Sequence, residues 1–311
     1  MTLNGGWTYR EQVGPAGGGL TVLEYLAATR LHSTSEEWAE RLERGEVEIE
    51  GRRVGGDAVL QPGQTIVWHR PPWHEDEVPR HYATVYEDDS IVVVDKPSGL
   101  PTMPAGGFLQ NTLLTLMRDT YPEASPLHRL GRHTSGLVLF ARTHEAASAL
   151  SRAWRDHAVK KVYRALGLGE TRTEIFVIDA PIGPVPHPLL GTVEAAAEGG
   201  KPSHSVAVVL DTSGDRTLFN VEITTGRPHQ VRIHLAYAGH PLVGDPLYDA
   251  GGGLKRHPGL PGDGGYLLHA ERLEFAHPAT GTWMSVTSRP PAELLTRSEQ
   301  RELLEIAPQL R

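Results

Sequence analysis

Short runs of apolar, β-branched residues recur through the last two thirds of this 311-residue chain, and they constrain its fold more than any other feature. Each run is bounded by turn-forming residues, which is typical of strands. Helical patterns at 109–119 and 144–157 fall among them at irregular intervals, without a fixed-period repeat. This mixture indicates an α+β fold with a mostly antiparallel mixed sheet and flanking helices. The runs lie at 91–94, 136–142, 161–169, 203–212, 218–223 and 265–276.

The first 80 residues are expected to form a separate, smaller unit. Residues 1–18 are glycine-rich and aperiodic, so we expect a loose N-terminus. Residues 19–69 carry two helical patterns and then short strands, with Ser33 or Ser35 as the cap of the second helix. A proline-rich, charged linker at 70–80 follows. The large domain is then expected at 81–295, with a last helix at 296–311.

Composition narrows the class of protein. The chain has no cysteine, which excludes disulfides and thiolate metal sites. Its N-terminus shows no signal-peptide pattern and no run of residues is apolar enough to span a membrane, so we expect a cytoplasmic protein. The net charge is −8, yet residues 128–164 hold eight Lys or Arg against Glu145 and Asp156, a local charge of +6. A positive region of this kind suits a phosphate-bearing ligand.

Two polar segments are candidates for a functional site. The first is 128–143, "HRLGRHTSGLVLFART", in which cationic residues precede a buried strand. The second is "TGRPHQVRIHLAYAGHPLVGDPLY"; if 230–234 is a strand, Gln230, Arg232 and His234 share one face. A hydrolase centred on Ser135 is disfavoured because "HTSG" is not a G-x-S-x-G elbow. A metal site at His229, His234 and His240 is disfavoured because their spacing matches no helical ligand pair.

Five segments resemble, in order, the motifs of the RluA-type RNA pseudouridine synthases. "HRLGRHTSG" is similar to the family's HRLD-x-x-TSG signature, and "KKVYRALGLG" to its Lys-x-Tyr-x-Ala strand. "VVVDKPSGLPTMP", "TGRPHQVRIHLAYAGHPLVGDPLY" and "YLLHAERLEFAHPATG" resemble the family's opening loop, third motif and closing hairpin. Residues 18–68 resemble a small ribosomal-protein-type RNA-binding module of α/β type. The resemblance implies a two-domain enzyme that isomerises uridine to pseudouridine in ribosomal or transfer RNA.

The resemblance also implies roles for individual residues. It implies that no cofactor or metal is needed, and that the aspartate which ends HRLD acts as the nucleophile or as an ion that stabilises the sugar. In this chain that position is Gly131. Tyr163 matches the family tyrosine that stacks on the base, and Arg232 the arginine that pairs with the aspartate. Three explanations for Gly131 remain open: a substitute acid such as Asp95, Asp245 or Glu123; a different route through His133 or Tyr163; or an RNA-binding relative without catalysis, acting as a chaperone or assembly factor.

The remaining candidate residues are expected to contact RNA. An enzyme of this kind must take its target base out of the stack, and Arg129 or His128 is suited to fill the gap. Cationic and polar side chains near the motifs are expected to bind phosphates and the base. The full set of candidate RNA-binding residues is His128, Arg129, Arg132, His133, Thr134, Lys160, Lys161, Arg227, His229 and Gln230.

Overall fold

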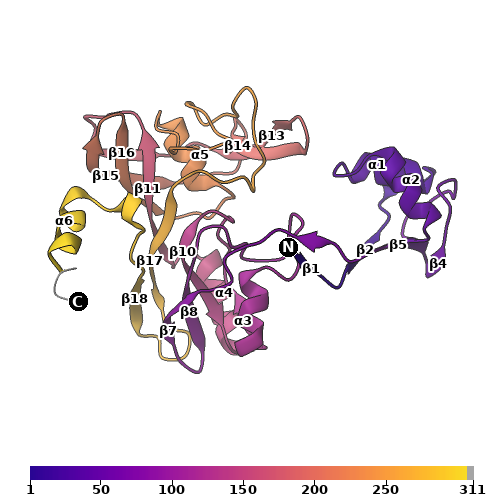
Figure 1. The fold of residues 1–311 in the computed structure, drawn as a ribbon, viewed down its shortest axis with the longest axis horizontal. Coiled ribbons are helices and arrows are strands. Elements are labelled where there is room, and N and C mark those ends of the chain that lie inside the picture. The colour runs from indigo at the N-terminus through magenta and orange to yellow at the C-terminus, as the bar shows by residue number, and fades with distance from the viewer. Residues whose placement is uncertain (307–311) are drawn as a thin grey trace. The chain divides into compact units, whose positions relative to one another are not determined.

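The computed structural model describes residues 1–306 of the chain (Figure 1). These residues form two compact units, each with its own hydrophobic core. The first unit comprises Met1–Asp76 together with Pro186–Thr192, and the second contains the other described residues. None of the helices within this described part is both long and apolar enough to cross a bilayer.

The first unit is a four-stranded sheet with two helices. The strands lie in the order β2 (Trp7–Gln12), β5 (Thr65–Arg70), β3 (Val47–Ile49) and β4 (Arg52–Arg53). The helices are α1 (Val22–Thr29) and α2 (Ser35–Glu43). A 3₁₀ turn, η1 (Pro15–Gly17), precedes α1, and β1 (Thr2–Leu3) pairs with β6 (His74–Glu75).

Both helices of this unit begin with a capping box. The side chain of Thr21 accepts a hydrogen bond from the amide of Glu24, and the carboxylate of Glu24 accepts one from the amide of Thr21. Thr34 and Glu37 repeat the arrangement. The cap of α2 is therefore Thr34, and the expected Ser33 or Ser35 was one residue away on either side. The helices bury Val22 and Trp38 against the sheet.

The prediction of a loose N-terminus was wrong. Residues 7–12 form β2, which pairs with β5 along its whole length, from Trp7 opposite Arg70 to Gln12 opposite Thr65. The segment lacks the apolar alternation by which strands are recognised in a sequence because β2 lies at the edge of the sheet and most of its residues are exposed. Part of the expected linker is ordered too, since β6 lies within it.

The second unit is built on a ten-stranded sheet. Its main path runs β12-β15-β16-β11-β17-β10-β8-β7, with β18 beside β17 and β9 beside β10. Only β10 and β17 pair in parallel, so the prediction of a mostly antiparallel mixed sheet is confirmed. The strands are β7 (Ala83–Glu87), β8 (Ile91–Lys96), β9 (Ser125–Pro126), β10 (Ser135–Ala141), β11 (Lys160–Leu168), β12 (Ile175–Ile178), β15 (Ser205–Ser213), β16 (Arg216–Ile223), β17 (Leu268–Ala276) and β18 (Trp283–Thr287).

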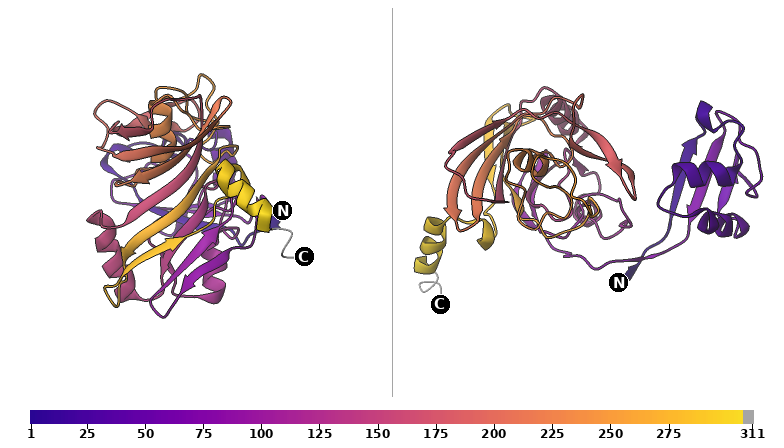
Figure 2. Two further views of the ribbon diagram at one scale, coloured as in Figure 1. Left: turned by 90° about the vertical axis from the view of Figure 1, so that its left-hand side faces the viewer. Right: turned by 90° about the horizontal axis from the view of Figure 1, so that it is seen from above.

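Alternation along the strands gives this sheet two buried faces. One face packs against α3 (Leu113–Thr120) and α5 (Gln230–Tyr237), and its core includes Val92, Val94 and Tyr163. The other packs against α4 (His144–Arg155) and includes Ile91 and Val93. Figure 2 shows the helices on the two sides of the twisted sheet. A hairpin of β13 (Ile182–His187) and β14 (Gly191–Ala196) forms a separate two-stranded sheet.

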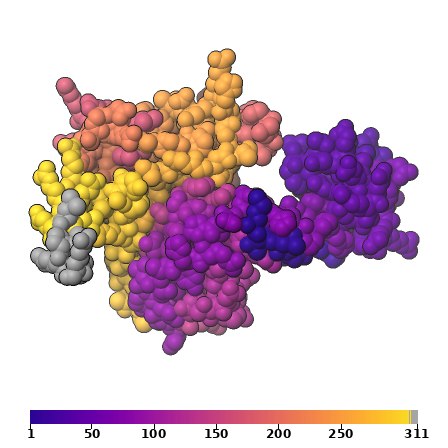
Figure 3. All heavy atoms as spheres, in the orientation of Figure 1, coloured from indigo at the N-terminus to yellow at the C-terminus, as the bar shows by residue number. Residues whose placement is uncertain are grey.

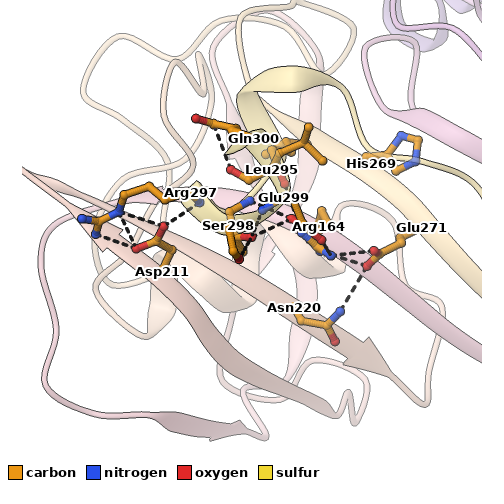
Figure 4. Close-up of polar contacts among 12 residues, drawn as sticks. Arg164, Asp211, Asn220, His269, Glu271, Leu295, Arg297, Ser298, Glu299 and Gln300 are labelled. Atoms are coloured by element: carbon orange, nitrogen blue, oxygen red, sulfur yellow. Dashed lines mark hydrogen bonds and ion pairs between the residues drawn. The ribbon is translucent and has the colours of Figure 1, made fainter. Parts of the chain in front are cut away.

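The C-terminal helix α6 (Arg297–Ile306) follows the 3₁₀ turn η2 (Ala292–Leu294) and lies on the surface of this unit (Figure 3). It is joined to the sheet through Arg164 of β11, whose guanidinium group forms bidentate ion pairs with both Glu271 and Glu299 (Figure 4). The Nη1 atom of Arg164 also donates to the carbonyl oxygen of Leu294, 3.2 Å away. The expected helix at 296–311 therefore exists over 297–306, and residues 307–311 lie outside the described residues.

Candidate active site

Segments from distant parts of the sequence meet on the face of the sheet that carries α5. Leu130 from the 128–136 loop, Tyr163 from β11, Val231 from α5 and Tyr266 before β17 belong to one buried cluster. Alternation along β11 points Tyr163 into this cluster and Arg164 to the opposite face. Four of the segments quoted from the sequence therefore contribute to one cluster, and Tyr163 and Tyr266 are the tyrosines among its buried residues.

The third motif forms a helix where a strand was expected. Residues 230–236 of α5 are all buried, so Gln230, Arg232 and His234 do not share one polar face. The alternation of Val231 and Ile233 is the pattern expected of a strand. A helix that is buried on all sides lacks the polar stripe from which a helical period can be recognised in a sequence. His229 precedes α5 in the left-handed region, with φ of 57°, which is uncommon for a residue other than glycine.

Arg232 is paired with Asp245. Its Nε and Nη2 atoms lie 2.7 and 2.8 Å from the two carboxylate oxygens, and both side chains are almost completely buried. Asp245 also accepts hydrogen bonds from the amides of Leu247 and Tyr248. Burial favours the neutral acid, but these bonds and the charge of Arg232 outweigh it and lower the pKa of Asp245. Among the three acids considered from the sequence, Asp245 is thus the partner of Arg232, while Asp95 accepts a bond from Ser288.

Position 131 faces the same cluster. A Cβ atom placed on Gly131 would lie 3.0 Å from the hydroxyl oxygen of Tyr266 and 3.4 Å from the Oγ1 of Thr134. The Tyr266 ring lies beneath the guanidinium group of Arg232, with 4.2 Å from the Cζ atom to the ring centroid. A hydroxyl group thus borders the space that a side chain at position 131 would enter. Tyr266 was not singled out from the sequence, although it opens the quoted segment "YLLHAERLEFA".

Lys96 holds two of the site loops together. Its buried ammonium group donates to the carbonyl oxygens of Pro97, Leu100 and Arg132 at 2.7–3.1 Å. Desolvation lowers the pKa of Lys96 to about 7, although the negative charge of Asp95 acts to raise it. The lysine of the "KPSGL" segment therefore fixes the loop that carries Arg132 and has no group left over for a ligand.

His229 is held in one tautomer at the start of α5. The hydroxyl group of Tyr248 donates to the carbonyl oxygen of Glu194, so the Nδ1 of His229, 2.7 Å from the same hydroxyl, must carry the proton and donate to it. Desolvation, with the charge of Arg232, lowers the pKa of His229 to about 3. The imidazole is consequently neutral at physiological pH, and its Nε2 atom offers a lone pair.

The other candidate RNA-binding residues differ in what they contact. Arg129 and Lys160 are exposed, whereas Arg132, His133 and Arg227 are half-buried. His128 stacks on Trp154 and accepts a bond from the amide of Leu139, Lys161 donates to two backbone carbonyls, and Gln230 bonds to four groups around 204–227. Thr134 is buried beside Tyr266. A ligand can reach the exposed and half-buried residues, although Arg132 donates to the carbonyl oxygen of Gly99, Arg227 donates to that of Pro202, and Lys160 pairs with Glu274. The other four are held by structural partners.

Tyr163 combines a buried ring with a free hydroxyl group. The side chain is 8% exposed, and burial raises the pKa of its phenol to about 12. Within residues 1–306 the hydroxyl group forms no hydrogen bond. A neutral phenol with an unused donor, set in an apolar wall, can stack on a planar base and bond to it.

The geometry around Ser135 and around the three histidines fits neither a hydrolase nor a metal site. Ser135 lies 2.9 Å from the Nδ1 of His269, but the second imidazole nitrogen faces the carbonyl oxygen of Ser288 and not a carboxylate. His269 pairs with Arg164, on the sheet face opposite Tyr163. His234 bonds to Ser205 and to the carbonyl oxygen of Ala180, and His240 to that of Leu168. No group of three or more metal-ligating side chains is found within the described part of the chain.

Comparisons with known proteins agree with this architecture. Residues 90–237 match a family model described as RNA pseudouridylate synthase. An uncharacterised RNA pseudouridine synthase of Synechocystis is 42% identical over 88% of this chain and 96% of its own length. The chain belongs to the RNA pseudouridine synthase family. RNA pseudouridine synthase 5 of Arabidopsis thaliana is 35% identical over 88% of this chain and 89% of its own length. The expected RluA-type resemblance is thereby confirmed.

One further relative and a solved structure extend the comparison. Ribosomal large subunit pseudouridine synthase D of Nitrosomonas europaea is 38% identical over 63% of this chain and 58% of its own length. The structure of human RNA pseudouridylate synthase domain containing 1 covers 75% of this chain and 98% of its own, with 24% identity and a TM-score of 0.55. This similarity supports the fold.

Proposed function

We propose that this pseudouridine synthase isomerises uridine in ribosomal or transfer RNA, in the cytoplasm, through the cluster around Tyr163, Arg232 and Gly131. The carrying observation is that four of the quoted sequence segments contribute to one buried cluster, with the guanidinium group of Arg232 lying over the ring of Tyr266. Relatives named for the ribosomal large subunit support ribosomal RNA as the substrate class. In the reaction the N1–C1′ bond breaks, the base rotates and C5 bonds to C1′; C5 loses its hydrogen and N1 gains one. No step calls for a metal or an organic cofactor.

Within this proposal Tyr163 binds the base. Its ring forms an apolar surface, and its phenol, neutral at physiological pH, offers a donor to a uracil carbonyl. Arg232 acts by position, because its charge is already compensated by Asp245; the pair fixes α5 against the loop that contains Tyr248. The charge of Arg129 contributes to lowering the pKa of His229, so the two side chains are near each other. In this proposal Arg129 binds a phosphate group and His229 binds a base edge.

In this chain a group other than an aspartate at position 131 has to take the role that the family aspartate plays. Asp245 is unsuited to it, because hydrogen bonds to Arg232 and to two backbone amides occupy its oxygens. The hydroxyl group of Tyr266 borders the space beside Gly131, and half-buried His133 packs edge-on against the Tyr266 ring. Desolvation and neighbouring cations lower the pKa of His133, so its imidazole is neutral and able to accept a proton.

Release of tritium from RNA labelled at uridine C5 tests the proposal directly. The wild-type protein should release tritium from ribosomal or transfer RNA, because C5 must lose its hydrogen when it bonds to C1′. Tyr163→Leu, which keeps an apolar side chain but loses the ring and the hydroxyl group, should bind RNA and release far less. A wild-type protein that binds RNA and releases no tritium would instead identify the non-catalytic RNA-binding alternative.

A further inference from the structure

The first unit carries an aromatic and cationic surface that the proposed reaction does not use. Trp7 and Tyr9 on the edge strand β2 are 52% and 43% exposed, and alternation places them on one face of the sheet. Arg70 lies directly opposite Trp7, and Trp68 lies opposite Tyr9. We propose that this surface, made by Trp7, Tyr9 and Arg70, binds single-stranded RNA by stacking of its bases.

The exposed ring of Tyr9 is in contact with a row of aromatic rings that begins in the core of the first unit. Trp38 of α2 meets Trp68 edge-on at 4.8 Å, and Trp68 stacks on Tyr9 with centroids 5.1 Å apart and planes inclined by 17°. Tyr9 is thereby held flat against its neighbour, and its exposed side is presented as a planar surface. A ring fixed in this way loses little conformational freedom when a base stacks on it.

Arg70 supplies a cation that is held by aromatic rings. Its guanidinium group lies 3.5 Å above the centroid of the Trp73 ring and 5.9 Å from that of Trp68. Within residues 1–306 it forms no ion pair. Two aromatic rings thus orient the guanidinium group without neutralising it, which leaves its charge available to a phosphate group.

A hollow beside these residues has the size of a nucleotide and firm walls. It measures about 370 Å³ and is bordered by Gly5, Gly6, Trp7, Thr8, His69 and Arg70. Asn4 fixes the wall, because its side chain accepts bonds from the amides of Gly6 and Trp73 and donates to Glu75. A Cβ atom on Gly6 would lie 2.6 Å from the carbonyl oxygen of Arg70, so only glycine permits this approach.

Charge distinguishes this surface from a general phosphate-binding patch. Residues 1–76 contain seven arginines and no lysine against twelve acidic residues, a net charge of −5. Such a unit repels the RNA backbone overall, so its affinity must come mainly from stacking and from about one or two phosphate contacts. Stacking on exposed rings also selects unpaired bases, because paired bases have both faces covered.

This inference rests on the proposed function only in taking RNA as the partner, and its test can be separated from that of catalysis. The probe is an eight-nucleotide RNA of adenosine and cytidine, which holds no uridine for the catalytic site. The full chain should bind this octamer more tightly than the same octamer paired with a complementary DNA strand, a duplex that also holds no uridine. Tritium release by the wild type reports on catalysis alone, so either proposal can fail while the other stands.

Point variants of the full chain test the surface. Trp7→Ala and Tyr9→Ala should each weaken octamer binding about tenfold, and the factor should be the same at low and high salt because stacking involves no counterion release. Arg70→Gln should weaken binding by a factor that shrinks as salt is raised. Trp283→Ala is the matched control, because Trp283 lies on β18 of the second unit and is 54% exposed. Ultraviolet crosslinking should attach the octamer to Trp7 or Tyr9.

Three results would overturn the inference. The first is octamer affinity unchanged in Trp7→Ala and Tyr9→Ala. The second is an equal loss in Trp283→Ala, which would show that any exposed tryptophan suffices. The third is a change of self-association in sedimentation for the two variants without any change in RNA binding, which would identify the surface as a protein interface.

Discussion

At the scale of single residues, the hydroxyl group of Tyr266 borders the space that a side chain at position 131 would occupy. If this hydroxyl takes part in the isomerisation, Tyr266→Phe should lower tritium release by about a hundredfold while RNA binding persists. In Gly131→Asp the new Cβ would crowd the hydroxyl at 3.0 Å. The double variant Gly131→Asp with Tyr266→Phe removes this contact and supplies a carboxylate, so it should regain activity lost in Tyr266→Phe. Full activity of Tyr266→Phe would exclude a role for the hydroxyl.

The ion pair of Arg232 and Asp245 should contribute mainly to stability. Asp245→Asn leaves a buried guanidinium group without its countercharge, which costs about 3–5 kcal/mol in the free energy of unfolding. Urea denaturation measures this loss. Arg232→Met with Asp245→Leu removes both charges and should recover most of it. Asp215→Asn, in an exposed pair with Arg216, is the control and should change stability by less than about 1 kcal/mol. An equally small change in Asp245→Asn would contradict the argument.

Single residues also show where sequence reasoning ends. The resemblance located Tyr163, Arg232 and the vacant position 131, because motif spacing is carried by the sequence itself. It did not separate side chains that are free to bind from those with internal partners: Lys161 is charged like Lys160, but only the fold shows that Lys161 is buried against backbone carbonyls. Partners such as Asp245 and Tyr266 come from loops whose course no local pattern specifies.

At the scale of elements, α6 is a helix that the sequence predicts and α5 is one that it does not. Capping residues mark the start of α6, where Thr296 and Glu299 exchange hydrogen bonds. α5 has no polar stripe because it is buried on all sides, so the alternation of Val231 and Ile233 predicts a strand where the structure has a helix. The long strands of the second unit were identified correctly, since their apolar runs have the length and boundaries of strands.

The attachment of α6 should depend on pH through Glu299. Hydrogen bonds from Arg164 lower the pKa of Glu299 to about 2, below its ordinary value of 4.5. The folded state therefore favours the ionised carboxylate, so the stabilisation is complete above about pH 4.5 and is lost as pH falls toward 2. The intrinsic rate of amide hydrogen exchange itself slows as pH falls, so observed rates are divided by it. After this correction, exchange within 297–306 should accelerate across this range. In Glu299→Gln exchange should already be faster at pH 5, with a weaker pH dependence; exchange that is the same in both proteins would refute the role of the pair.

At the scale of the whole molecule, the two units have separate cores and different chemistry. The core of the first is built around Trp38 and Trp68, whereas that of the second follows the two faces of a long sheet. The cationic segment 128–164 belongs to the second unit, and the first is acidic with exposed aromatic rings. An RNA bound by both would be held by phosphate contacts in one unit and by stacking in the other.

Separate cores predict unfolding in more than one step. Four of the six tryptophans, Trp7, Trp38, Trp68 and Trp73, lie in the first unit, whereas most strand residues lie in the second. Tryptophan fluorescence should therefore follow mainly the first unit in urea, and far-ultraviolet circular dichroism mainly the second. The two transitions should not coincide, because separate cores need not unfold cooperatively. Trp38→Phe, in the core of the first unit, should lower the fluorescence midpoint and leave the main dichroism transition nearly unchanged. Superimposable curves that shift together in this variant would show instead that the two units unfold as one.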